Sequence, residues 1–169
     1  MSPAAIIFGS TTGNTEDLAY RIYDEFDGCA DAPRDIYTTP VSRLLKHHTL
    51  IIGIPTWNRG RLQSDWAERA EELISHSFEG RKVAFFGSGD ARNYPDSFQD
   101  AMGILWNRFE RRGAELIGKW PSESYRFGSS RGLIDGGRCF VGLPFERHDP
   151  NDKVERRIRD WVRRLHQEI

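Results

Sequence analysis

The chain has 169 residues and a net charge of −1 at pH 7, with 38% hydrophobic and 29% charged residues. This length and composition predict a single domain over residues 1–169 with its own core, and argue against a disordered chain. No run of about 18 apolar residues predicts a membrane span. No charged and apolar leader precedes the first apolar segment, so we expect a cytoplasmic protein. The two cysteines and five histidines lack metal-ligand spacing, which argues against a metal site.

The charge is unevenly spread along the chain. Residues 1–80 carry 7 basic and 12 acidic side chains, whereas residues 81–169 carry 17 basic and 13 acidic ones. This asymmetry predicts either a dipole that orients the molecule against a charged partner or an ordinary solvated surface.

Short apolar runs alternate with helical patterns along the chain. The patterns predict, in order, strand 4–8, helix 14–26, strands 34–37 and 49–54, helix 63–75, strand 82–86, helix 97–112, a fifth strand that starts at 114–118 and resumes at 139–143, and helix 151–166. Continuous apolar strands that alternate with helices indicate a doubly wound parallel sheet covered on both faces. Residues 119–138 are predicted to be an inserted surface segment.

Hydroxyl and amide side chains follow the first strand, at Ser10, Thr11, Thr12, Asn14 and Thr15. They lie where a helix is predicted to begin, and a helix N-terminus offers unpaired N–H groups and a partial positive charge. Such a loop can hold a phosphate. It has neither the lysine of the GxxxxGK[ST] loop nor the GxGxxG pattern of dinucleotide sites. The alternative is an ordinary N-cap.

Aromatic side chains follow the third and fourth strands. Trp57 and Tyr94 lie in neighbouring loops at the edge where such sheets bind ligands, and flat aromatic rings suit a planar ring system. Gly87 and Gly89 would let the backbone approach a ligand closely. Together with the phosphate loop, these features predict a site for a phosphorylated planar cofactor. The alternative for Trp57 is packing against the core.

The three loops, in order and spacing, resemble those of flavodoxins, and the resemblance covers the whole chain. It is carried by residues 10–16, 55–66 and 87–103, and the interrupted fifth strand is similar to that of the long-chain subgroup. The resemblance implies a three-layer α/β sandwich with a five-stranded parallel sheet of order 2-1-3-4-5, helices on both faces and an insertion that splits strand five. It also implies an electron-transfer protein, not an enzyme, with non-covalently bound flavin mononucleotide (FMN).

The resemblance assigns parts of the cofactor to each loop. The first loop would hold the phosphate, Trp57 and Tyr94 would flank the isoalloxazine ring, Asn58 and Arg59 would meet flavin N5, and Glu146 would lie near the ribityl chain. The loop after the fourth strand would face the pyrimidine edge. The implied cofactor-binding residues are Ser10, Thr11, Thr12, Gly13, Asn14, Thr15, Thr56, Trp57, Asn58, Arg59, Gly60, Ser88, Gly89, Asp90, Asn93, Tyr94 and Glu146.

The implied function is that of a low-potential, one-electron carrier that passes between quinone, semiquinone and hydroquinone. A carbonyl group of the second loop, at Asn58, would accept a hydrogen bond from protonated N5. The anionic hydroquinone, held between two aromatic rings with few cations, would be disfavoured. The implied partners are an NAD(P)H-dependent flavodoxin reductase or a similar donor, and an acceptor protein. Both would contact the exposed flavin edge of a monomer transiently.

The sequence departs from the family in its charge, because flavodoxins are usually strongly acidic. Arg59, Arg61 and Arg92 fall in the two loops predicted to border the flavin. Cations there are expected to make the hydroquinone couple less negative and to favour a less basic partner surface. The alternative is that these side chains extend outward and change little. The turn at residues 144–152 also departs from the expected acidic turn.

Three alternative functions remain open at this point. An FMN-dependent NAD(P)H or quinone reductase on the same fold would need an open flavin face, which Trp57 and Tyr94 would cover. A non-redox module would bind a nucleotide or a partner without flavin. Nucleic-acid binding through the basic final helix is the weakest alternative, because Glu155 and Asp160 interrupt its arginines and no aromatic stack accompanies them.

Overall fold

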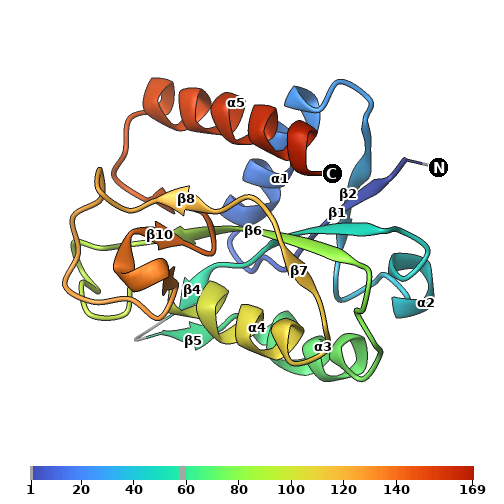
Figure 1. Cartoon of the computed structure of the whole chain (residues 1–169). Helices are drawn as coiled ribbons and strands as arrows, with labels where there is room; N and C mark the ends of the chain where they lie inside the picture. The colour runs from blue at the N-terminus through green and yellow to red at the C-terminus, as the bar shows by residue number, and fades with distance from the viewer. Residues whose placement is uncertain (1, 58–59) are drawn as a thin grey trace.

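A central parallel sheet forms the middle layer of the molecule (Figure 1). The computed structural model describes residues 2–57 and 60–169. The sheet runs in the order β11-β6-β3-β1-β2, and every neighbouring pair is parallel. This order confirms the predicted topology. The strands are β1 (Ala4–Phe8), β2 (Ala30–Asp35), β3 (Thr49–Gly53), β6 (Lys82–Gly89) and β11 (Gly142–Glu146).

The fifth position of the sheet is shared by two short strands, as the sequence predicted, but the second does not begin at Cys139. Residues 139–140 belong to a separate antiparallel sheet, and the second strand runs over Gly142–Glu146. β7 (Glu115–Leu116) pairs with the start of β6, and β11 pairs with residues 85–89 of the same strand. The chain leaves the sheet between β7 and β11.

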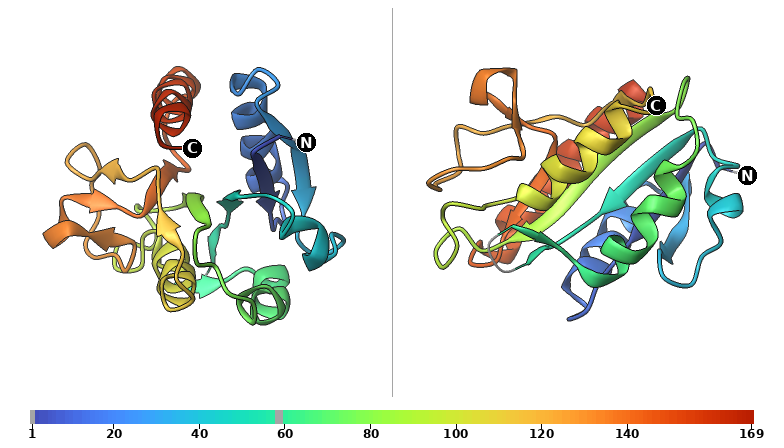
Figure 2. Two further views of the ribbon diagram at one scale, coloured as in Figure 1. Left: turned by 45° about the vertical axis from the view of Figure 1, so that its right-hand side comes forward. Right: turned by 90° about the horizontal axis from the view of Figure 1, so that it is seen from below.

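Helices cover both faces of the sheet, which explains why all residues of β1 and β3 are buried. One face carries α1 (Asn14–Glu25) and α5 (Asn151–Glu168), and the other carries α3 (Ser64–Ile74) and α4 (Asp100–Glu110), as Figures 1 and 2 show. Helix α5 packs through a stripe of apolar residues at helical spacing, namely Val154, Ile158, Trp161, Val162 and Leu165. No helix in the described part of the chain has the length and apolar character needed to cross a bilayer.

Several boundaries differ from the sequence predictions. The second strand lies at Ala30–Asp35, not at 34–37, because it is an edge strand whose half-exposed residues form no continuous apolar run. Helix α3 begins after Gln63, whose side-chain oxygen accepts a hydrogen bond from the Trp66 N–H at 3.3 Å. Helix α4 begins only at Asp100, because Gln99 has a φ of 61°. The short helix α2 (Val41–Leu44) was not predicted.

The inserted segment is more ordered than a plain surface excursion. It contributes β8 (Trp120–Pro121), β9 (Leu133–Ile134) and the 3-10 turn Asp135–Gly137, and it forms an antiparallel sheet with β10 (Cys139–Phe140). Aromatic rings from the segment and its surroundings pack together around Phe98. They belong to Phe98, Tyr125, Phe127 and Phe140. This packing fixes the segment beside the loop that follows β6.

Candidate functional site

The loops after β1, β3 and β6 meet at the carboxyl edge of the sheet, where parallel α/β sheets bind ligands. The Gly9 N–H donates to the Gly53 carbonyl at 3.2 Å, and the Ile54 N–H donates to the Phe86 carbonyl at 3.0 Å. Side chains also connect the loops. The hydroxyls of Thr15 and Ser88 lie 3.4 Å apart.

The first loop presents most of its polar side chains to solvent. Thr11, Thr12 and Asn14 are exposed and Ser10 is half-buried, whereas Thr15 is buried. Gly13 is the N-cap residue of α1 with a φ of 84°, and no described side chain caps the helix. The Gly13 N–H donates to the Ser10 hydroxyl at 3.0 Å. The described side chains therefore do not form the ordinary N-cap, and the first N–H groups of α1 have no side-chain partner among the described residues.

The second loop carries a short hairpin of β4 (Thr56–Trp57) and β5 (Arg61–Leu62), which forms one wall of the candidate site. The Thr56 hydroxyl accepts a hydrogen bond from the Ala101 N–H at 3.2 Å, which fixes the hairpin on the start of α4. Gly60 has a φ of 87°, and a Cβ atom there would lie 2.6 Å from Asp100 Oδ2. The predicted site residues Asn58 and Arg59 lie outside the described residues.

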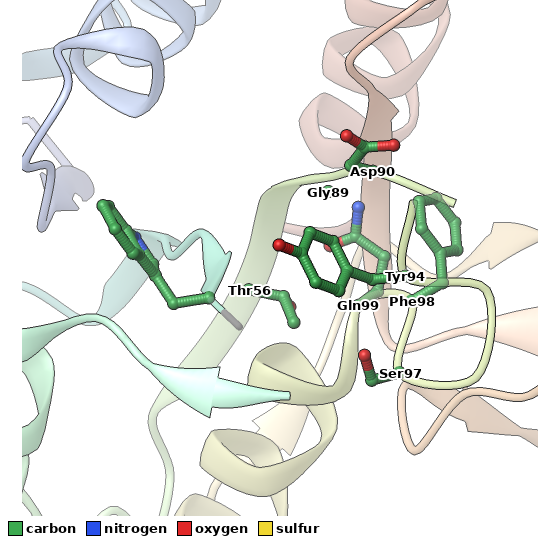
Figure 3. A pocket seen from close by; sticks show the side chains of 8 residues that line it. Thr56, Gly89, Asp90, Tyr94, Ser97, Phe98 and Gln99 are labelled. Atoms are coloured by element: carbon green, nitrogen blue, oxygen red, sulfur yellow. The ribbon is translucent and has the colours of Figure 1, made fainter. Parts of the chain in front are cut away.

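The loop after β6 forms the opposite wall, and together with the hairpin it encloses a shallow cleft. Figure 3 shows Tyr94, Phe98 and Gln99 gathered beside the end of β6. Trp57 is half-buried and lines this cleft, and the Tyr94 side chain is 43% exposed at its border. The structure thus brings both predicted aromatic residues to one cleft. The cleft is lined by Thr56, Trp57, Gly89, Asp90, Tyr94, Ser97, Phe98 and Gln99.

Gln99 is the main site residue that sequence reasoning missed. It is fully buried, and its Nε2 donates to the carbonyls of Gly87 at 3.0 Å and Phe145 at 3.3 Å. Its Oε1 is buried with no hydrogen-bond partner among the described residues. A Cβ atom at Gly87 would lie 2.5 Å from this oxygen, so Gly87 makes room for Gln99. The two glycines spaced two residues apart on β6 were one sequence signal of such a groove, and Gln99 itself lies within residues 87–103, which carry the family resemblance.

A polar network of side chains lies at the end of β6, beside the cleft. The Asp90 carboxylate accepts hydrogen bonds from the Asn93 N–H at 3.0 Å and the Asn93 amide at 2.7 Å, and His148 Nε2 lies 3.4 Å away. Burial opposes ionisation of Asp90, but the hydrogen bonds and His148 outweigh it and lower the pKa of this carboxyl group. Glu146 accepts hydrogen bonds from the N–H groups of Ala91 at 2.7 Å and His148 at 3.1 Å. The loop after β6 is therefore held by side chains of the protein itself.

The chain is similar to known proteins along its whole length. The family model described as Flavodoxin matches residues 6–156. A flavodoxin from a Nostoc species is 40% identical over 164 residues, covering 97% of this chain and 95% of the relative. A flavodoxin from Synechococcus elongatus is 40% identical over 170 residues, covering 100% and 99% of the two chains. The crystal structure of Fusobacterium nucleatum flavodoxin bound to flavin mononucleotide superimposes with a TM-score of 0.90 at 19% identity, covering 100% and 99%.

Proposed function

Because this chain belongs to the flavodoxin family, we propose that it binds FMN without a covalent bond and carries single electrons between redox proteins. Bound FMN supplies the redox chemistry, while the protein binds and orients it. The observation that carries the proposal is the cleft at the carboxyl edge of the sheet, which both Trp57 and Tyr94 line. The start of α1 is connected to the same edge through Thr15, whose hydroxyl lies 3.4 Å from that of Ser88.

The residues of the first loop fit the phosphate end of the cofactor. Ser10, Thr11, Thr12, Asn14 and Thr15 offer hydroxyl and amide donors beside the positive end of the α1 dipole. At Gly13 no atom of the described residues, its chain neighbours aside, lies within 4 Å of a Cβ position, so the backbone there is open to a ligand. These groups would bind the phosphate by hydrogen bonds and need no lysine.

The residues of the other two loops fit a planar ring. Trp57 and Tyr94 would stack on the isoalloxazine ring and exclude water from it. Ser88, Gly89, Asp90 and Asn93 would face the pyrimidine edge, and the buried Gln99 Oε1 offers an acceptor there.

Two further assignments follow the family pattern. Asn58 and Arg59 would meet the N5 edge of the ring, with Gly60 beside them in the same loop. Glu146 would lie near the ribityl chain, and its hydrogen bond to the Ala91 N–H holds the loop that carries Tyr94.

Flavodoxins work with redox partners, and we infer two classes of partner for this chain. An NAD(P)H-dependent flavodoxin reductase or a similar donor would reduce it, and an acceptor protein would oxidise it. Both would bind transiently at the exposed edge of the ring to a monomer in the cytoplasm.

Reconstitution tests this proposal. Purified protein is mixed with FMN, and coulometric titration with spectroscopic detection counts the electrons taken up at each potential. We expect two separate one-electron steps, and no steady oxidation of NAD(P)H without an added reductase. A single two-electron step, or steady NAD(P)H oxidation by the protein alone, would contradict the carrier function.

A matched pair of variants locates the site. Tyr94→Ala removes a ring that lines the cleft, whereas Tyr37→Ala removes another exposed tyrosine that does not line it. We expect Tyr94→Ala to weaken FMN binding about tenfold or more, and Tyr37→Ala to leave it unchanged, because only the first loses a stacking contact. Equal affinities of the two variants would overturn the placement of the ring.

A further inference from the structure

A second cavity lies between the inserted segment, the end of β11 and the first turns of α5. It measures about 550 Å³, counting the space that is open to solvent, which is within the usual range of small-molecule sites. Among the described residues, its lining shares only Phe98 with the cofactor cleft, and Glu146 is the one lining residue that would also lie near the cofactor. The cavity is therefore separate from the site proposed for FMN.

Aromatic side chains line one part of this cavity. Phe98 is buried, and its ring centroid lies 6.1 Å from that of Tyr125. The Tyr125 hydroxyl donates a hydrogen bond to the Pro144 carbonyl at 2.7 Å. Burial raises the pKa of Tyr125, so its ring stays uncharged. Together the two rings offer an apolar surface on which another ring can pack.

A buried ion pair lies beside the two rings. Arg157 is only 7% exposed, its guanidinium carbon lies 4.2 Å from the centroid of the Tyr125 ring, and its Nη1 donates to Asp149 Oδ2 at 2.6 Å. Lys153, one turn earlier in α5, donates to Asp149 Oδ1 at 3.0 Å. Buried charges are retained where the fold holds their partners close to them. This part of the cavity is therefore formed before any ligand binds.

The hydrogen-bond acceptors of the cavity are already used. Each carboxylate oxygen of Asp149 accepts a bond from a cationic side chain of α5, and each carboxylate oxygen of Glu146 accepts a bond from a backbone N–H. An ionised carboxylate has no hydrogen to donate. A ligand that brings hydrogen-bond donors would therefore have to compete with groups of the protein.

The hydrogen-bond donors of the cavity, in contrast, are in excess. Arg126 is exposed, and in the described part of the chain its guanidinium group has no carboxylate or hydrogen-bond partner. The ammonium group of Lys153 has three N–H bonds, of which Asp149 takes one.

The charge of the lining favours an anion. Three cationic side chains line the cavity, those of Arg126, Lys153 and Arg157, against the two carboxylates of Glu146 and Asp149. The other ionisable side chains of residues 123–126 and 146–157 are exposed, where water screens them, namely Glu123, Arg147, His148, Asp152, Glu155 and Arg156. The cavity therefore suits a ligand with hydrogen-bond acceptors and one negative charge.

We propose that this cavity is a binding site for a small aromatic carboxylate. The ring of the ligand would pack against Phe98 and Tyr125, and its carboxylate would accept hydrogen bonds from Arg126 and Lys153. A guanidinium group binds a carboxylate through two parallel N–H bonds, which fixes the orientation of the ligand as well as its charge. The site is distinct from the cofactor cleft, and the proposal does not rest on the proposed function.

Benzoate is the probe, because it joins one aromatic ring to one carboxylate. It is titrated into the FMN-loaded protein, in which the cofactor fills the cleft, while ¹H–¹⁵N spectra are recorded. Benzamide has the same shape without the charge, and acetate has the charge without the ring. We expect benzoate to shift the amide signals of residues 124–126, with a Kd about tenfold lower than that of either control compound.

Two matched variants locate the carboxylate. Arg126→Gln removes a cation that lines the cavity, whereas Arg131→Gln removes an exposed arginine of the same inserted segment that does not line it. We expect Arg126→Gln to raise the Kd for benzoate about tenfold and to leave that for benzamide unchanged, because only the charged ligand loses its partner. Arg131→Gln should keep the Kd for benzoate within about twofold.

The outcomes separate this proposal from the proposed function. Equal affinities for benzoate and benzamide, equal effects of the two variants, or unshifted signals of residues 124–126 at about 20 mM benzoate would overturn the site and leave the electron carrier intact. If the protein takes up no FMN, the carrier function falls. The same titration of the unloaded protein then still tests the cavity, because the signals of residues 124–126 report on it and not on the cleft.

Discussion

The cleft and the first loop differ in how their polar groups are held. Beside the cleft, at β6 and its loop, Gln99, Asp90 and Glu146 make hydrogen bonds within the protein. In the first loop, Thr12 and Asn14 are exposed and the first turn of α1 has no side-chain cap among the described residues. The polar groups beside the cleft are therefore part of the fold, whereas Thr12 and Asn14 are free to bond a ligand. Substitutions should cost stability beside the cleft and affinity in the first loop.

The largest expected effect is the loss of stability caused by Gly103→Ala. A Cβ atom at Gly103 would collide with the Arg131 carbonyl oxygen. The backbone of residues 131–132 cannot move away freely, because two hydrogen bonds hold it. The Arg131 N–H donates to the Asp100 carboxylate, and the Gly132 carbonyl accepts from the Val141 N–H. We expect the free energy of unfolding of the apoprotein, measured by urea titration, to fall by about 3 kcal/mol.

The matched substitution in the first loop is Gly13→Ala, where the space is open but φ is 84°. We expect a loss of about 1 kcal/mol, from the left-handed backbone alone. Equal losses for the two variants would show that the two parts of the site are held alike.

Gln99→Leu is expected to have the next largest effect on stability. It removes the donor that Gly87 and Phe145 share and leaves two buried carbonyl groups without this partner. The expected loss is about 2 kcal/mol in the urea titration of the apoprotein. A loss below about 0.5 kcal/mol would mean that the Gln99 amide matters to the ligand and not to the fold.

Some parts of the fold and of the candidate site could be predicted from the sequence and others could not, for physical reasons. Buried strands such as β1 and β3 carry a continuous apolar signal, and the polar loop before α1 is contiguous in sequence, so both could be located. The edge strand β2 has no such signal. Gln99 is held by carbonyls 12 and 46 residues away in the chain, and no local pattern encodes those contacts. Similarly, the order of the inserted segment depends on aromatic packing around Phe98.

Thr12→Val tests whether the first loop binds the phosphate of the cofactor. The side chain is exposed, so the stability of the apoprotein should change by less than about 0.5 kcal/mol. The lost hydroxyl would have bonded a charged group, so we expect the Kd for FMN to rise about tenfold in a fluorescence titration. Riboflavin lacks the phosphate and is the control ligand, and its affinity should not change. Equal weakening of both ligands would place Thr12 near the ring and not near the phosphate.

The smallest expected effect is the pH dependence that Asp90 gives to stability. Because its pKa is lowered in the folded protein, this carboxyl group stabilises the fold above the pKa of an unfolded aspartate, about 3.9. That contribution is lost as the pH falls through the folded pKa. Asn93→Ala removes one of the hydrogen bonds that lower this pKa.

We therefore expect Asn93→Ala to reduce the free energy of unfolding by less than about 1 kcal/mol at pH 7, because Asn93 is exposed. The reduction should shrink as the pH falls below about 3.9 and through the lowered pKa of Asp90 in the folded proteins, where this carboxyl group loses its charge. Urea titrations of the two apoproteins between pH 3 and 7 measure the difference, and Asp90→Asn is the control that should abolish its pH dependence. A difference of equal size at pH 3 and pH 7 would mean that Asn93 stabilises the turn without acting on the Asp90 charge, and that the loop after β6 is held by geometry alone.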